Sequence, residues 1–176
     1  EIKAGEGDFS FEFAAGKASD TWTRAYDLPA GGRIEILNVN GEIRAEAAPA
    51  GKVEVTVERS ASAATDDEAR ELLNSVHMRE EIGAARVRIE TIAPRMRLGG
   101  HKASFLVRVP PGVHVDLRTV NGGVRLANVS GEVRASSTNG GVKGTIGAAS
   151  LVEARTTNGG VELSIDGALA PSGEVR

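Results

Sequence analysis

A six-residue phrase occurs three times in the second half of the chain and constrains the fold more than any other feature. The copies share the pattern Thr/Ser-x-Asn-Gly-Gly-Val and are Thr119–Val124, Ser137–Val142 and Thr156–Val161. Their asparagines lie 18 and 19 residues apart. A fixed period near 20 residues is typical of repeat architectures, in which each unit buries its apolar face against the next.

Valine recurs at half this interval, so the structural unit is a turn followed by a strand of about five residues. The valines that define the register are spaced by 9 or 10 residues and are Val115, Val124, Val133, Val142, Val152 and Val161. Because successive side chains of a strand point to opposite faces, these valines should face the core. The residues that follow them are all charged and should face water: Asp116, Arg125, Arg134, Lys143, Glu153 and Glu162.

The asparagine-glycine turns and the double period together predict a fold class. Glycine adopts positive φ freely and asparagine tolerates it, which suits tight turns. Equivalence of alternate units favours coils of two strands and two turns, stacked about 4.8 Å apart. We therefore predict an all-β chain, a single-stranded parallel β-solenoid (β-helix-like) with one short inserted helix. An antiparallel meander with two-residue hairpin turns is the alternative.

We predict a single domain, 1–176, with five segments. They are N-terminal capping strands (1–31), first repeats (32–59), an insertion with a helix (60–103), main repeats (104–165) and a C-terminal tail (166–176). The first repeats take their register from Ile34, Ile43 and Val53. Most of the aromatic residues lie before residue 30, and we interpret them as strands that cover the end of the core. An aromatic ligand platform is the alternative for Phe9, Phe11, Phe13, Trp22 and Tyr26.

The insertion contains the one expected helix, over about 66–76. Thr65 is a candidate N-cap with Glu68 three residues later, and acidic residues fill the first turn. A loop follows that contains Met96, Arg97 and His101. Because loops often carry specific recognition, we expect it to be the most favourable place for a binding site.

The order of three motifs resembles the bacterial putative-adhesin family, a group of β-strand-repeat domains of unknown function. The motifs are Asn38-Val-Asn-Gly-Glu-Ile43, Val107-Arg-Val-Pro-Pro-Gly-Val113 and the serial Thr-Asn-Gly-Gly-Val phrases, over residues 20–165. The resemblance implies a β-solenoid fold and an extracytoplasmic location, whether periplasmic, secreted or envelope-anchored. It supplies no catalytic residues.

Two ladders of side chains follow from the predicted stacking, and both are assigned to structure. Turn asparagines can hydrogen-bond from coil to coil, which gives the set Asn40, Asn121, Asn139 and Asn158. On one outer face Asp116, Arg134 and Glu153 should form a charge ladder. The two carboxylates, two rungs apart at about 9.6 Å, also suggest a carbohydrate-active β-helix enzyme as an alternative. Arg134 between them disfavours it, because a neighbouring guanidinium favours ionised carboxylates and a general acid must be protonated.

Other chemistry finds little support in the sequence. The histidines His77, His101 and His114 stand apart from any nucleophile motif, and we expect no catalytic residue, metal or cofactor. A net charge of −3 gives no footprint for nucleic acid, and the absence of cysteine excludes disulfides. No apolar run approaches the ~20 residues of a membrane span. Residue 1 is glutamate, which suggests processing that would hide a signal peptide.

These observations predict a non-enzymatic, extracytoplasmic binding or scaffolding module of the bacterial cell envelope. Its partner would be a protein or a glycan that the sequence does not identify. The last complete strand, Val161–Ile165, should leave an open edge, so weak self-association through this C-terminal strand is expected.

Overall fold

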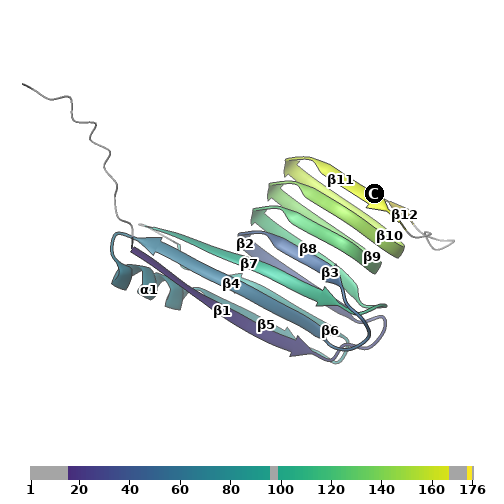
Figure 1. Cartoon of the computed structure of the whole chain (residues 1–176), viewed down its shortest axis with the longest axis horizontal. Coiled ribbons are helices and arrows are strands. Elements are labelled where there is room, and N and C mark those ends of the chain that lie inside the picture. Colours follow the sequence, from purple (N-terminus) through teal and green to yellow (C-terminus); the bar gives the residue numbers. More distant parts are fainter. Residues whose placement is uncertain (1–15, 96–98, 167–173, 176) are drawn as a thin grey trace, which may run out of the picture.

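The computed structural model describes residues 16–95, 99–166 and 174–175, which form one mixed twelve-stranded sheet and one helix (Figure 1). The predicted all-β class with a single short helix is confirmed. Phe9, Phe11 and Phe13, Met96 and Arg97, and most of the tail lie outside the described residues.

The sheet curls so that two walls of strands face each other across one core (Figure 1). Wall A consists of β6 (Arg86–Ile92), β2 (Arg33–Asn40), β8 (His114–Asn121), residues 133–139 of β9 (Val124–Asn139) and residues 152–158 of β10 (Val142–Asn158). Wall B consists of β7 (Gly100–Val109), β3 (Ile43–Ala47), the first halves of β9 and β10, and β11 (Val161–Ile165). Neighbouring strands within each of these sets are parallel.

The repeat register of the sequence is visible in the pairing of strands. Val133 lies between Val115 and Val152 in wall A, and Val142 lies between Val124 and Val161 in wall B. Val115, Val133 and Val152 are at most 1% exposed. The interval of 10 residues before Val152 is accommodated by irregularities between Gly144 and Leu151, where β10 carries one more residue than β9.

The sheet as a whole is nevertheless not the predicted parallel β-solenoid but a curled half-barrel of mixed strands, because antiparallel strands extend it. In the described ranges the antiparallel strands are β1 (Gly16–Tyr26), β4 (Val53–Ala63) and β5 (His77–Ile82). The unit at Val53, expected as a third repeat, is the start of β4, which pairs antiparallel with β1 and β7. This arrangement gives β4 backbone partners along both edges.

The segment expected as an insertion contributes to the core. Its strand β6 pairs parallel with β2, and β7 pairs parallel with β3, so both extend the stack on the side away from β8 and β9 (Figure 1). The expected boundaries at 59/60 and 103/104 do not coincide with element ends, because β4 and β7 run through them.

Helix α1 (Asp66–Ser75) matches its sequence signal. Thr65 accepts a hydrogen bond from the Glu68 N–H at 3.2 Å, and the Glu68 carboxylate accepts one from the Thr65 N–H, which completes a capping box. Ala69 and Leu73 are its buried residues, and the helix packs beside β1 and β4. Among the described residues, no helix is long and apolar enough to cross a membrane.

Candidate binding surface

The four turn asparagines lie above one another and form a continuous hydrogen-bonded ladder. Each amide nitrogen donates to the amide oxygen of the asparagine before it: Asn121 to Asn40 at 2.7 Å, Asn139 to Asn121 at 2.8 Å and Asn158 to Asn139 at 2.8 Å. These contacts engage most of the amide groups with one another. Along the ladder, the inner asparagines thus use one amide N–H and the amide oxygen in contacts with one another.

His101 closes the lower end of this ladder. Its Nε2 lies 3.4 Å from Nδ2 of Asn40, and burial lowers the pKa of the imidazole, which favours the neutral ring. His77 lies exposed on β5, whereas Nδ1 of His114 accepts a hydrogen bond from the Glu132 N–H at 2.8 Å. The three histidines lie on different strands with different partners, and in the described ranges no histidine and carboxylate cluster could hold a metal.

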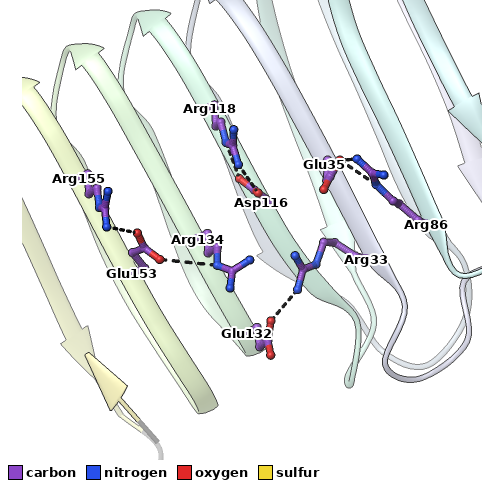
Figure 2. Close-up of polar contacts among 9 residues, drawn as sticks. All are labelled: Arg33, Glu35, Arg86, Asp116, Arg118, Glu132, Arg134, Glu153 and Arg155. Carbon is purple, nitrogen blue, oxygen red and sulfur yellow. Dashed lines mark hydrogen bonds and ion pairs between the residues drawn. The ribbon is translucent and has the colours of Figure 1, made fainter. Parts of the chain in front are cut away.

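The outer face of wall A carries a lattice of paired charges (Figure 2). Arg33 reaches Glu132 at 2.6 Å, and Arg86 reaches Glu35 at 2.6 Å. Glu153 contacts two guanidinium groups, which are Arg155 at 2.7 Å and Arg134 at 3.7 Å. Cross-strand pairs of this kind each contribute roughly 0.2–1 kcal/mol to stability.

Asp116 departs from the expected ladder. The register places it beside Arg134, but its carboxylate accepts two hydrogen bonds from Arg118 on its own strand, at 2.8 and 3.0 Å. These bonds raise the pKa of Arg118 above its usual value. Asp116 was expected to face water, yet it is only 4% exposed. The Arg118 side chain is bonded to it, and the flanking strands place Glu35 and Arg134 beside it. The structure thus joins Arg134 to Glu153 and pairs Asp116 separately.

This pairing disfavours acid–base catalysis by Asp116 and Glu153. Each carboxylate is engaged by at least one arginine of the chain, whereas an inverting glycosidase needs two carboxyl groups that face the scissile bond. We expect the double variant Asp116→Asn, Glu153→Gln to keep the fold with modestly lower stability. A screen of acidic and neutral bacterial polysaccharides, read by reducing-end release, should detect no cleavage by the parent or the double variant. Cleavage by the parent that the double variant loses would contradict this expectation.

The aromatic side chains of β1 do not form an open ligand platform. The guanidinium of Arg24 covers the Trp22 ring at 4.8 Å from its centroid, and the Tyr26 hydroxyl donates a hydrogen bond to Glu80. Burial, followed by this hydrogen bond, raises the pKa of Tyr26. Both rings are occupied by contacts within the chain.

The outer face of wall B and of the adjoining β4 and β1 carries a row of four neighbouring hollows, called here together the wall B groove. Their volumes are about 640, 400, 310 and 550 Å³. The first and second share Ser60 and Lys102, the second and third share Glu58 and Ser104, and the third and fourth share Arg44. The groove therefore crosses β1, β4, β7, β3, β9 and β10, a lateral distance of roughly 24 Å at the usual strand spacing.

The polar residues of the groove are mainly hydroxyl-bearing and charged side chains. Its small polar residues are Ser19, Thr21, Thr56, Ser60, Ser62 and Ser104. Its cationic residues are Lys17, Lys102, Arg59, Arg44, Arg125 and Lys143, against the carboxylates Asp20, Glu42, Glu46 and Glu58. The groove is thus net positive although the whole chain has a net charge of −3.

Three cations stand in one row across the far end of the groove. The register places Arg125 directly between Arg44 and Lys143. Arg125 also contacts Glu42 at 2.6 Å, and Lys143 contacts Glu162 at 3.7 Å, while Arg44 has no ion-pair partner among the described residues. Like charges directly opposite each other destabilise a sheet, so an anion bound along this row would relieve repulsion.

The expected recognition site overlaps this surface at one position. His101 borders the first hollow, whereas Met96 and Arg97 lie outside the described residues. The remaining groove residues come from strands far apart in the sequence. The alternation of Arg44, Arg125 and Lys143 with buried neighbours marks them as outward-facing, but only the register shows that they are adjacent.

No family model and no curated protein matches the chain. Among solved structures, it resembles a putative cell adhesion protein from Clostridium sporogenes, with 9% identity, a TM-score of 0.37, and coverage of 90% of this chain and 98% of that one. It also resembles a putative adhesin from Parabacteroides distasonis, with 10% identity, a TM-score of 0.37, and coverage of 90% and 73%. A putative lipid binding protein from the same organism matches with 8% identity, a TM-score of 0.30, and coverage of 89% and 76%.

The first two neighbours are named as adhesion proteins and the third as a lipid binding protein. With TM-scores below 0.5 and identities near 10%, the likeness does not define an activity.

Proposed function

We propose that this chain is a non-enzymatic, extracytoplasmic binding module that holds a linear anionic glycan in the wall B groove. The observation that carries the proposal is the continuity of the groove across six strands, with Arg44, Arg125 and Lys143 adjacent at one end and Lys17 and Lys102 at the other. A linear polymer can contact all of these positions at once, whereas a small compact ligand cannot.

The chemistry of the groove favours a sugar polymer with acidic groups. Serine and threonine hydroxyls both donate and accept hydrogen bonds, which suits the hydroxyl groups of a glycan. Lysine and arginine attract carboxylate or sulfate groups, and the exposed setting makes this attraction sensitive to salt. The two walls differ in this respect, because the charges of wall A that Figure 2 shows are all paired with one another, whereas Arg44 in wall B has no ion-pair partner among the described residues.

The extracytoplasmic location rests on the resemblance of the sequence motifs to the putative-adhesin family. Cell fractionation of the full-length native protein would test it, and recovery from the cytosol alone would contradict it.

Reversal of charge in the groove should abolish binding to an acidic glycan. We expect wild-type protein to bind oligogalacturonate at low ionic strength more tightly than neutral dextran of similar length. The variant Arg44→Glu, Lys143→Glu should bind at least about tenfold more weakly, a loss of about 1.4 kcal/mol, because attractive contacts become repulsive. Isothermal titration at two salt concentrations measures both the affinity and its electrostatic part.

A matched control and two outcomes make the experiment decisive. Arg70→Glu makes the same kind of charge change on the exposed face of α1, outside the groove, and should leave binding unchanged. Equal affinity of the groove variant and the parent would refute the site. Equal affinity of the parent for polyglutamate would indicate an acidic protein as the partner instead of a glycan.

A further inference from the structure

The outermost turn of the asparagine ladder, Asn158–Val161, lacks the neighbour that each inner turn has. Val161 is 48% exposed, whereas its equivalents Val142 and Val124 are at most 1% exposed. A Cβ on Gly160 would meet nothing within 4 Å, but on the equivalent Gly141 it would lie 3.2 Å from the Gly160 carbonyl oxygen. Among the residues that the structure describes, the next turn is absent.

Each inner turn is joined to the turn above it by the same four hydrogen bonds. At the last step, the Gly140 N–H donates to the Asn158 carbonyl at 3.0 Å, and the Val142 N–H donates to the Gly160 carbonyl at 2.9 Å. The Thr156 hydroxyl donates to the Gly140 carbonyl at 2.7 Å, and the Asn158 amide donates to Asn139 Oδ1 at 2.8 Å.

The step below repeats this pattern with the residues one turn lower. Its distances, in the same order, are 3.1, 2.9, 2.7 and 2.8 Å. The same four hydrogen bonds therefore join each turn of the ladder to the next.

By equivalence, the outermost turn offers the same four groups to a partner. The donors are the N–H groups of Gly159 and Val161, and the acceptors are the Gly159 carbonyl and Asn158 Oδ1. The partner must supply a hydroxyl and a primary amide two residues apart, followed by a backbone that turns without a Cβ clash. The phrase Ser/Thr-x-Asn-Gly meets all of these requirements.

We propose that this end of the sheet is a docking site for an extended segment of another polypeptide that carries Ser/Thr-x-Asn-Gly and adds in parallel as the next turn. Such strand addition gains affinity from backbone hydrogen bonds and specificity from side chains. The two-residue strand β12 (Glu174–Val175) pairs with Leu151 and Val152, at the other end of wall A, and leaves Asn158 uncovered.

A second copy of this chain fits the site less well. Its inner phrases are already engaged, and its lower ladder end is closed by His101. Its own Asn158 end would bring one Oδ1 acceptor against another, and a two-fold arrangement would pair β11 with itself antiparallel. The self-association expected from the sequence is therefore treated as an outcome that would contradict this proposal.

The test uses a labelled peptide with the chain's own residues 135–147, which contain one complete phrase and do not overlap the position of β12. Fluorescence anisotropy should show saturable binding to the wild-type protein. The protein variants Asn158→Leu and Gly160→Val should each weaken binding at least about tenfold. The first removes the acceptor, and the second fills the space where the new backbone would lie.

Controls separate docking from stability. Thr157→Ala lies beside the site on an exposed position and should bind normally, and a peptide with Asn139→Leu should bind poorly. All protein variants should melt within a few degrees of the parent, since the end of the ladder is exposed. The proposal is overturned if the peptide does not bind, if both protein variants bind it normally, or if the wild-type protein dimerises through this end and the peptide cannot displace the second copy.

Discussion

Replacement of Val133 by aspartate is expected to abolish cooperative folding. Val133 is fully buried between Val115 and Val152 in wall A. A carboxylate at this point would lose its hydration without a partner, at a cost on the order of 5 kcal/mol or more. This loss is comparable with the whole stability of an ordinary domain, about 5–15 kcal/mol. Thermal unfolding followed by circular dichroism at neutral pH should show no transition or a greatly lowered one.

The same substitution on the neighbouring strand provides the control. Val120 on β8 is 41% exposed, so Val120→Asp keeps its charge in water and should melt close to the parent. A near-normal melting temperature for Val133→Asp would mean that the register of β9 is shifted by one residue, because such a shift exchanges the two faces of a strand.

Alanine at Gly122 is expected to lower the melting temperature by roughly 10 °C. The Cβ would lie 2.2 Å from the Gly41 carbonyl oxygen, and the residue has φ of +148°, which L side chains rarely adopt. Since the obstructing atom belongs to the backbone, two stacked turns must separate. A combined cost of about 3 kcal/mol corresponds to this shift in a chain of this size. Differential scanning calorimetry measures it directly.

Gly160, the second glycine of the last copy of the phrase, provides a control that has neither the positive φ nor the close backbone neighbour of Gly122. A Cβ there meets nothing within 4 Å, so Gly160→Ala should change the melting temperature by no more than about 3 °C. Equal effects of the two substitutions would show that the inner turns are not stacked as closely as the structure indicates.

The charged residues on the two outer surfaces of the sheet have different roles. In wall A, each carboxylate drawn in Figure 2 contacts at least one guanidinium group, on its own strand or on a neighbouring one. In wall B, Arg44, Arg125 and Lys143 are neighbours, and the groove continues beyond them towards Lys102. A surface with a surplus of one charge sign, such as the wall B groove with its six cationic residues and four carboxylates, attracts ligands of the opposite sign, whereas a balanced one contributes stability.

The local features of this protein could be read from its sequence. Alternation at period two placed the valines in the core, and the Thr/Ser-x-Asn-Gly-Gly phrase identified the turns and the ladder from Asn40 to Asn158. The capping box at Thr65 located α1 within one residue of its end. These signals were readable because strand alternation, turn conformation and helix capping each depend on residues within a few positions of one another.

The order of strands was decided only by the tertiary structure. No local signal shows that β6 and β7 stack against β2 and β3, or that β4 runs antiparallel beside β7. Asn38 illustrates the point. Asparagine is typical of turns, yet Asn38 is buried. Its amide donates a hydrogen bond to the Ala103 carbonyl at 2.7 Å and accepts one from the Thr91 hydroxyl at 3.0 Å. These partners lie 65 and 53 residues away. The burial of Asp116 and the course of the wall B groove also follow from the order of strands. Strand edges with similar alternation can pair in several orders. The order adopted is the one that satisfies the buried polar groups and closes the core.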